Sequence, residues 1–308
     1  MSAPVQMTRS YLAVPAHRDR FVRNAAVSNA DAVFLDLEDA VPLLEKPSAL
    51  RACVDALQTV DWGNKHVTVR VNSVNSTFIG AEIEQLMACG RLDAIIIPKA
   101  EEPHEIAKIG ELCAARANPG SRPIGLELLI ETALGVTSVD SLAVAHQRVQ
   151  ALHFGVGDFA ASIGAHSTTV GVSPGGYQNI SVDQTTVMTP IDLFAYPMMR
   201  ILVAARSRAL RAIDGPYGDF SNLDASYLSA RKAASMGYDG KQVVHPSQIS
   251  PTHQAFRPAD DELSQAKRIV EAMKEAESRG LGATTVDGKM IDAVNIKMAQ
   301  RLLAFAGQ

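Results

Sequence analysis

Four apolar runs of the chain end in residues that can do chemistry. The runs are AVFLDLEDAVP (32–42), HVTVRVN (66–72), GLELLIE (125–131) and LHFGVGDFAAS (152–162). A charged group at the end of an apolar strand is costly to desolvate unless it is paired or binds an ion. Four such cases at similar places predict one site assembled from strand ends, which is how barrel enzymes build their active sites.

Glu131 and Asp158 are the candidate metal ligands. The pattern predicts that a strand delivers each of them to the C-terminal rim of a parallel sheet. Two carboxylates with no histidine or cysteine beside them favour a hard, oxygen-binding ion, and Mg²⁺ keeps positions open for water and substrate. The alternative is that Glu131 caps the following helix and that Asp158 pairs with an arginine.

Arg70 closes the second run, and its planar guanidinium can bind a carboxylate of a substrate or of the protein. The alternative is a structural bridge to Asp36 or Glu38. Period-two alternation puts Asp36 and Glu38 on one face of their strand, with Asp39 pointing elsewhere. Because several carboxylates on one ion would overcharge it, Glu38 and Asp39 are expected to support the site without binding the metal.

Three other polar residues lie within or at the ends of expected strands. One needs a partner in the interior, and each of the other two has two possible roles. Glu127 precedes Glu131 by four residues, so it lies on the same strand face about 13 Å deeper and needs a partner in the interior. Lys99, in AIIIPKAE, can form a Schiff base with a keto substrate or an ion pair with Glu101 or another rim carboxylate. His245, in QVVHPSQI, either donates to a ligand or has a structural role.

A basic cluster follows the first expected strand. Arg18 and Arg20 lie in VPAHRDRF, and Arg23 and Lys46 are expected nearby. Such a cluster at a rim suits a phosphate-bearing ligand. The alternative is that these are solvated surface side chains.

The elements that must position these residues are short β-branched runs alternating with longer amphipathic segments. We expect eight strands, at 11–15, 32–38, 66–72, 94–99, 123–131, 149–155, 211–216 and 241–245. The expected helices lie at 20–28, 48–60, 81–88, 105–117, 133–145, 191–210, 225–235 and 247–255. Near-continuous apolar strands alternating with helices predict a parallel sheet covered on both faces. Eight such units over about 250 residues favour an α/β fold of the closed (β/α)₈ TIM-barrel type, and no GxGxxG motif supports a dinucleotide-binding sheet.

Two regions exceed a minimal barrel. Residues 162–188 are polar and too long for an ordinary connection, which predicts a lid or wall over the site. The tail is expected to form a helix at 259–279, a loop at 280–288 and an amphipathic helix at 290–306. The predicted domains are therefore a catalytic barrel at 1–256 and a C-terminal helical extension at 257–308.

Bulk properties exclude several classes of protein. The chain has 308 residues and a net charge of −4, from 29 basic and 33 acidic side chains, with no long run of either sign. We therefore expect neither a nucleic-acid nor a membrane partner. The cysteines Cys53, Cys89 and Cys113 form no metal-like cluster, which favours buried, reduced thiols. With no signal-peptide pattern at the start and no bilayer-spanning run, the expected location is cytoplasmic.

At these residues the chain resembles the citrate-lyase β-subunit-like enzymes of the HpcH/HpaI aldolase superfamily. It is most similar to their malyl-CoA/β-methylmalyl-CoA lyase branch, a preference supported by ASIGAHSTTVGV and IDGPYGDF. The motifs that carry the resemblance fall in order along the chain: RSYLAVPAHRDRF, LDLEDAVP, VDWGNKHVTVRVN, IIIPKAE, LELLIETALG, FGVGDFAAS, IDGPYGDFSN, GYDGKQVVHPSQI and GKMIDAVNIKMA.

The resemblance implies a TIM-barrel lyase that uses Mg²⁺, or Mn²⁺ in its place, and assembles as a homotrimer or homohexamer. Its reaction would be the reversible retro-Claisen cleavage of malyl-CoA or β-methylmalyl-CoA to glyoxylate and acetyl-CoA or propionyl-CoA. Its partners would be a CoA thioester and a small 2-oxo acid. The alternatives are a citramalyl-CoA lyase, a malyl-CoA thioesterase or malate-synthase-like enzyme, and a metal-independent Schiff-base aldolase using Lys99.

The resemblance also implies roles for particular residues. Glu131 and Asp158 match metal ligands, and Arg70 matches the arginine that holds the oxo acid. Asp292, in GKMIDA, matches an acid/base that the C-terminal tail delivers into a neighbouring subunit's site. The remaining matches are the CoA-contacting Arg18 and the substrate contacts Gly157, Val244 and His245. Ala13 and Asn24 depart from the aromatic residue and the lysine that related lyases can carry near the nucleotide, and alanine replaces a common proline after MID.

Overall fold

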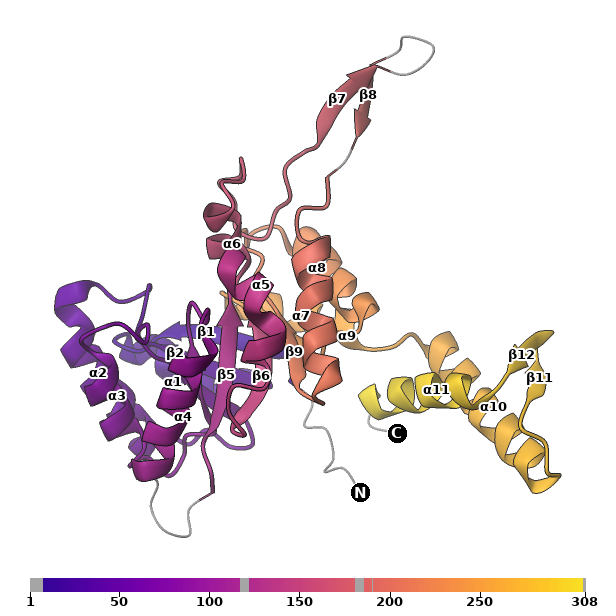
Figure 1. Ribbon diagram of the computed structural model, residues 1–308, viewed down its shortest axis with the longest axis horizontal. Helices are drawn as coiled ribbons and strands as arrows, with labels where there is room; N and C mark the ends of the chain where they lie inside the picture. Colours follow the sequence, from indigo (N-terminus) through magenta and orange to yellow (C-terminus); the bar gives the residue numbers. More distant parts are fainter. Residues whose placement is uncertain (1–7, 117–121, 181–185, 190, 307–308) are drawn as a thin grey trace. The chain divides into compact units, whose positions relative to one another are not determined.

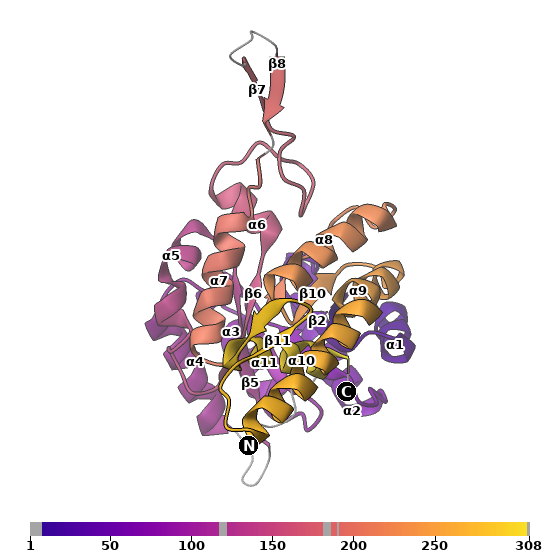
Figure 2. The same cartoon turned by 90° about the vertical axis from the view of Figure 1, so that its right-hand side faces the viewer.

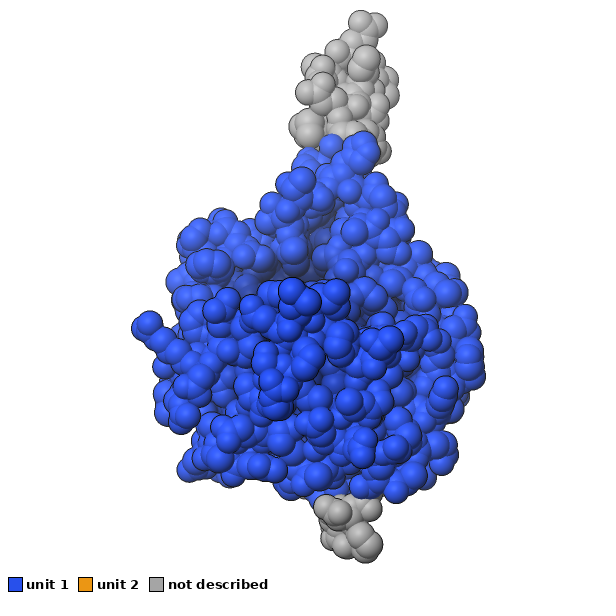
Figure 3. Space-filling view, turned by 90° about the vertical axis from the view of Figure 1, so that its left-hand side faces the viewer, with its two compact units in different colours: residues 1–252 blue, residues 253–308 orange. Residues whose placement is uncertain are grey.

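The computed structural model describes residues 8–116, 122–180, 186–189 and 191–306. The chain divides into two compact units, Met1–Thr252 and His253–Gln308. The first unit presents a rounded surface with a recess in it (Figure 3).

The first unit is a closed barrel of eight parallel strands. Its order is β1-β10-β9-β6-β5-β4-β3-β2, and β1 closes the ring by pairing with both β10 and β2. The strands are β1 (Ser10–Pro15), β2 (Ala32–Asp36), β3 (His66–Arg70), β4 (Ala94–Ile97), β5 (Gly125–Ile130), β6 (Val149–Phe154), β9 (Arg211–Asp214) and β10 (Gly240–Val243). Every expected strand is present, so the predicted (β/α)₈ barrel is confirmed.

Helices cover the barrel between the strands (Figure 1). They are α1 (Asp19–Val27), α2 (Lys46–Thr59), α3 (Ile79–Leu86), α4 (Pro103–Arg116), α5 (Ala133–Leu142), α7 (Ala195–Ser207), α8 (Leu223–Met236) and α9 (Ile249–Phe256). Local sequence sets several of their ends. Thr132 begins α5 by accepting a hydrogen bond from the amide of Gly135, and Asn222 does the same for α8. Gly237, with φ of 105°, ends α8 in the left-handed conformation that glycine adopts without strain.

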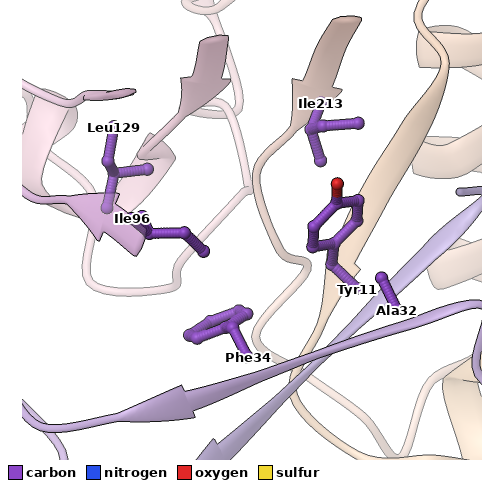
Figure 4. Close-up of a cluster of buried hydrophobic side chains, with 6 residues drawn as sticks. All are labelled: Tyr11, Ala32, Phe34, Ile96, Leu129 and Ile213. Carbon is purple, nitrogen blue, oxygen red and sulfur yellow. The ribbon is translucent and has the colours of Figure 1, made fainter. Parts of the chain in front are cut away.

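Apolar side chains from alternate positions of the strands fill the barrel interior. Figure 4 shows one such cluster of buried residues, contributed by β1, β2, β4, β5 and β9: Tyr11, Ala32, Phe34, Ile96, Leu129 and Ile213. Because the side chains of a strand alternate between its faces, the intervening residues point outward and pack under the helices. This core makes the strand ends a rigid frame for the rim.

A charged network occupies another part of the interior and gives Glu127 the partner that the sequence required. Its carboxylate lies within hydrogen-bonding distance of four side chains: His66 Nε2 and His153 Nε2 (2.8 Å each), Gln150 Nε2 (3.0 Å) and Arg211 Nη2 (2.5 Å). Burial by itself raises the pKa of Glu127, but the charges of Arg211 and His66 and the hydrogen bonds outweigh burial. The pKa of Glu127 therefore lies well below its usual range.

The long segment after β6 contains structure that the sequence did not predict. Helix α6 (Val156–Ser162) follows β6 directly, and strands β7 (Tyr177–Ile180) and β8 (Thr186–Thr189) form an antiparallel hairpin. Residues 181–185 and 190 lie outside the described residues. The segment's role as a lid or wall over the site stays a prediction.

The second unit contains two packed helices and, between them in the chain, a short hairpin (Figure 2). Helix α10 (Asp260–Ser278) packs against α11 (Ala293–Phe305), and β11 (Thr284–Val286) pairs antiparallel with β12 (Lys289–Ile291). The expected loop at 280–288 was therefore wrong in part. Asp287 and Gly288, with φ of 49° and 74°, make the two-residue turn that favours a hairpin.

Two bulk expectations can be compared with the structure. Cys53, Cys89 and Cys113 are buried and unbridged, as predicted for reduced thiols. Within the part of the chain that the structure describes, no helix has the length and apolar character needed to cross a bilayer.

Candidate active site

Glu131 lies at the end of β5, held between the ends of two neighbouring strands. Its side chain is buried, at 1% exposure. The backbone N–H of Lys99, just beyond β4, donates to Glu131 Oε1 at 2.8 Å. Gly155, just beyond β6, leaves the space that the Glu131 carboxylate fills, because a side chain there would overlap it. Strand ends β4, β5 and β6 thus fix the position of one carboxylate.

Glu131 has no cationic partner at salt-bridge distance among the described residues. Burial raises the pKa of Glu131 to about 8, since the attraction of Arg70 is too weak to offset it and the negative charges of Asp158 and Glu38 act in the same direction as burial. A buried carboxylate in this condition is stabilised by a cation.

Asp158 follows the strand that was expected at 149–155 and belongs to a helix that the sequence did not predict. It lies in the first turn of α6, beyond the end of β6, and its side chain is exposed. Strand β6 ends at Phe154, and Gly155 begins a helix whose buried residues are Val156, Phe159 and Ala160. Asp158 is nevertheless close enough to Glu131 for its charge to raise the pKa of that carboxyl.

The donor set at Glu131 and Asp158 fits Mg²⁺. In the described ranges no three side chains of the His, Cys, Asp and Glu types converge on one point. Mg²⁺ does not need such a cage, because it is commonly held by one or two carboxylates together with water and substrate oxygens. One buried and one exposed carboxylate would leave positions open on the solvent side.

Arg70 forms the structural bridge that was the alternative interpretation of this residue. Its Nε and Nη2 donate to the two carboxylate oxygens of Asp36, at 2.8 and 2.7 Å. Its third nitrogen, Nη1, lies 3.1 Å from Glu38 Oε2 and 3.7 Å from Asp39 Oδ2. Burial raises the pKa of Asp36, but Arg70 and two backbone amides outweigh burial and lower it. Asp36 therefore fixes the guanidinium and leaves Nη1 facing the other carboxylates.

Lys99 pairs with a rim carboxylate, although not with Glu101. Its Nζ lies 2.6 Å from Glu38 Oε1 and 3.8 Å from Asp39 Oδ1. Burial lowers the pKa of Lys99, but the hydrogen bond and charge of Glu38 outweigh it, so the pKa is raised. A Schiff-base lysine needs the opposite shift, since only the neutral amine attacks a carbonyl.

A cavity of about 320 Å³ lies between the ends of β1 and β10 and helix α1. Its lining brings together residues far apart in sequence: Leu12, Ala13, Val14, Pro15, Phe21, Asn24, Ala25, Val244, His245 and Pro246. A second, open hollow is lined by His17, Arg18, Asp19, Arg20 and Phe21. Phe21 borders both, so the hollow that Arg18 lines adjoins the cavity that Val244 and His245 line.

His245 is oriented by neighbours that the sequence did not single out. Its Nδ1 accepts a hydrogen bond from the Ser247 amide at 3.2 Å, which leaves the proton of the neutral ring on Nε2. Phe220 stacks on the ring, with centroids 4.7 Å apart. The amides of Val244 and His245 both donate to Gln248 Oε1, at 3.0 and 3.2 Å. The imidazole and the carbonyl groups are therefore what this pair can offer a ligand.

Lys46 directs its ammonium group to acceptors outside the basic cluster. Its Nζ donates to the carbonyls of Leu37 and Glu38, at 2.9 and 2.8 Å, and to Asn72 Oδ1 at 2.6 Å. It fastens the end of β2 to the segment after β3. Arg23 pairs with Asp19 on exposed helix α1 at 3.0 Å.

Asp292 begins helix α11 in the second unit. Its Oδ1 accepts hydrogen bonds from the amides of Val294 and Asn295, at 2.9 and 3.4 Å. The amide of Asp292 donates to Asn295 Oδ1 at 3.0 Å and completes a capping box. The cap holds the carboxylate in one orientation at the start of the helix.

A closed barrel with charged side chains gathered at its strand ends has the architecture of a TIM-barrel enzyme. The model of the HpcH/HpaI aldolase/citrate lyase family matches residues 9–246. The chain belongs to this family, and it is a carbon–carbon lyase.

Relatives and solved structures match nearly the whole chain. An L-malyl-CoA/β-methylmalyl-CoA lyase of Cereibacter sphaeroides is 34% identical over 301 residues, 96% of this chain and 94% of the relative. A (3S)-malyl-CoA thioesterase of the same species is 30% identical, over 97% of this chain and 94% of the relative. The structure of CitE from Mycobacterium tuberculosis with magnesium, acetoacetate and coenzyme A is 27% identical. It has a TM-score of 0.74 and covers 97% of this chain and 98% of that one.

Proposed function

We propose that this protein is a Mg²⁺-dependent lyase for CoA thioesters. It would reversibly cleave malyl-CoA or β-methylmalyl-CoA to glyoxylate and acetyl-CoA or propionyl-CoA. The observation that carries the proposal is Glu131, a buried carboxylate with room made for it, no cationic partner among the described residues and Asp158 nearby. The similarity to malyl-CoA lyases supports the choice of substrate.

Glu131 and Asp158 would hold the ion, and a structure of a relative contains magnesium. Bound there, Mg²⁺ or Mn²⁺ would stabilise negative charge that develops on oxygen of the 2-hydroxy acid, a contribution of several kcal/mol in comparable sites. Glu38 and Asp39 would support the site through Lys99 and Arg70, which they contact.

Arg70 would bind the oxo acid, and Asp292 would transfer the proton. Nη1 of Arg70, directed by the bond between the rest of the guanidinium and Asp36, would bind the carboxylate or the carbonyl oxygen of the oxo acid. In cleavage, the 2-hydroxyl group would lose its proton to solvent and its oxygen would become the carbonyl oxygen of glyoxylate. The bond between the carbinol carbon and the thioester's α-carbon would break, with its electron pair passing to the enolate of the thioester. Asp292 would deliver a proton to that α-carbon, and in condensation it would remove the proton.

We propose that Asp292 reaches this site from a neighbouring subunit of a homotrimer or homohexamer, carried by the extension at 257–308. Exposed apolar side chains on either side of Asp292 support this arrangement. Val294 and Met298, which are 61% and 63% exposed, lie four residues apart on one face of α11, and Met290 of β12 is 72% exposed. A second copy of the chain would cover them beside Asp292.

The CoA moiety would occupy the cavity between β1, α1 and β10. Arg18 would meet a phosphate at its entrance, and Val244 and His245 would contact the pantetheine arm or the thioester. Ala13 and Asn24 line this cavity, so the departures from related lyases fall where they would alter the grip on CoA. Gly157, beside Asp158 in α6, would contact the acid end of the substrate.

A thioesterase is the second candidate, because a relative with that activity covers nearly the whole chain at 30% identity. Water would then attack the thioester and release free malate. Citramalyl-CoA differs from malyl-CoA by one methyl group, which an apolar pocket discriminates by only about 1–3 kcal/mol.

A coupled assay tests the proposal. Glyoxylate and free CoA would be measured with malyl-CoA, β-methylmalyl-CoA, citramalyl-CoA and free malate, each with Mg²⁺ and with EDTA. Mg²⁺-dependent glyoxylate from CoA esters, but not from malate, is the expected result. Free CoA without glyoxylate would indicate a thioesterase. Cleavage that survives EDTA, with pyruvate trapped on Lys99 by borohydride, would overturn the metal-dependent mechanism.

A further inference from the structure

Lys99 has an unusual backbone conformation. Its φ is 48°, and in the described chain only Ala209 and Asp287 share positive φ among residues other than glycine. Residues with a Cβ rarely adopt this left-handed conformation. Such strain persists only where the surroundings impose it, and it is concentrated at functional sites.

In this turn the Lys99 N–H points at Glu131. That N–H donates to Oε1 at 2.8 Å, the hydrogen bond that fixes one oxygen of the buried carboxylate. Gly155 lies against Oε2, where the missing side chain leaves space. Oε1 is therefore held by a hydrogen bond, and Oε2 packs against Gly155, where an added Cβ would lie 2.5 Å from it.

Neighbouring elements hold this turn in place. The amide of Ala100 donates to the carbonyl of Leu129 at 3.2 Å, which ties the turn to β5. Gly135 lets α5 approach the turn at residues 99–100, because a Cβ at position 135 would lie 2.7 Å from the Ala100 carbonyl oxygen. The packing of β5 and α5 thus imposes the backbone of residues 99–100.

The Lys99 side chain contacts a different carboxylate. Its Nζ lies 2.6 Å from Glu38 Oε1, so the backbone serves Glu131 and the ammonium serves Glu38. A substitution that removes only the ammonium can therefore be separated from one that also disfavours the turn.

We propose that Lys99 is a positioning residue whose left-handed backbone, rather than its ammonium group, orients Glu131 for the divalent cation. The inference rests on the proposed function, in which Glu131 is a metal ligand. It assigns the Lys99 backbone to the orientation of a metal ligand, a role that does not depend on the side-chain amine.

The test compares Lys99→Gly, Lys99→Ala and Lys99→Val by calorimetric titration of Mg²⁺ into the metal-free, full-length protein. All three remove the ammonium. Glycine adopts positive φ freely, alanine adopts it with strain, and β-branched valine resists it most. Changes to groups that orient a ligand typically weaken metal affinity 10–100-fold. We expect Lys99→Gly to bind Mg²⁺ at least 10-fold more tightly than Lys99→Val, with Lys99→Ala between them.

Equal Mg²⁺ affinities across folded variants would overturn the inference. Circular dichroism establishes folding, and if Lys99→Val does not fold, the comparison of glycine with alanine decides, with a gap of at least threefold expected. Glu131→Gln distinguishes a failure of the proposed metal site from a failure of the inference on Lys99. If that variant loses Mg²⁺ binding while the Lys99 series is flat, only the inference on Lys99 fails. If it binds Mg²⁺ like the wild type, the metal assignment fails and the inference fails with it.

Discussion

Glu127 and Glu131 lie four residues apart on one strand and are both buried, yet their surroundings are opposite. Glu127 is bonded by Arg211, His66, His153 and Gln150, and its pKa lies well below the usual range. Glu131 has a single backbone donor, and its pKa is raised to about 8. The fold compensates the buried charge of Glu127 internally and gives Glu131 no cationic partner at salt-bridge distance among the described residues. The contrast separates a structural carboxylate from a candidate catalytic one.

Glu131→Gln should separate the two carboxylates most strongly. Losing a metal ligand removes several kcal/mol of stabilisation from the reaction, so we expect lyase activity to fall about 1,000-fold or more. The fold should persist, since an uncompensated charge is removed. Steady-state rates, with a melting curve, check both parts. Exposed Glu84→Gln on α3 is the control and should keep full activity. Near-normal Mg²⁺-dependent activity in Glu131→Gln would contradict the assignment.

Glu127→Gln should show the reverse pattern. Removing the charge leaves Arg211, which is 18% exposed, without its ion partner, and breaking such a pair costs about 3–5 kcal/mol where it is fully buried. Denaturant unfolding measures the loss, and activity per folded molecule should change little. Stability unchanged from that of Glu84→Gln would show that the interior network is not needed.

Gly155→Ala tests whether the space beside Glu131 matters. The added methyl group overlaps the carboxylate, so we expect Mg²⁺ affinity to fall about 10–100-fold, as when a group that orients a ligand is changed. Calorimetric titration measures the change. Gly80→Ala is the matched control, because nothing lies within 4 Å of a Cβ there. Equal affinities in the two variants would mean that Glu131 can move without consequence.

Lowering the pH should gradually remove the stability that ionised Glu127 gives the folded protein. A carboxyl whose folded pKa is depressed contributes its full stability above the unfolded pKa and loses it as pH falls toward the folded pKa. Below about pH 4, the gap in unfolding free energy between wild type and Glu127→Gln should narrow by about 1.4 kcal/mol for each pH unit. Denaturant unfolding between pH 3 and 7 checks this. A gap that stays constant over that range would show that Glu127 titrates normally.

The sequence predicted the elements better than their details. Alternating apolar strands and amphipathic helices located all eight barrel strands, because burial on both faces imposes a continuous apolar pattern. Helix α6 was missed because the FGVGDFAAS run reads equally well as the end of a strand. The β11–β12 hairpin was missed although its Asp287–Gly288 turn is a known signal.

The ends of the expected strands located the candidate site, but they did not predict which of its charged side chains pair with one another. Sequence placed Arg70, Lys99 and Glu131 at the rim. It could not choose between the substrate and a carboxylate of the protein for Arg70, or between Glu101 and another rim carboxylate for Lys99, because pairs across strands depend on the barrel's register. The stacking of Phe220 on His245 had no signal of its own beyond the IDGPYGDF motif.

By itself the sequence determined the barrel, the family and the set of charged residues at the rim, because burial patterns and motif order are properties of the chain alone. Only the tertiary structure decided which charges neutralise one another. Ion pairing acts over a few ångströms, and contacts such as Lys99 with Glu38 join residues 61 positions apart. The same closure of the barrel gave Glu127 its partners and left Glu131 with one backbone donor.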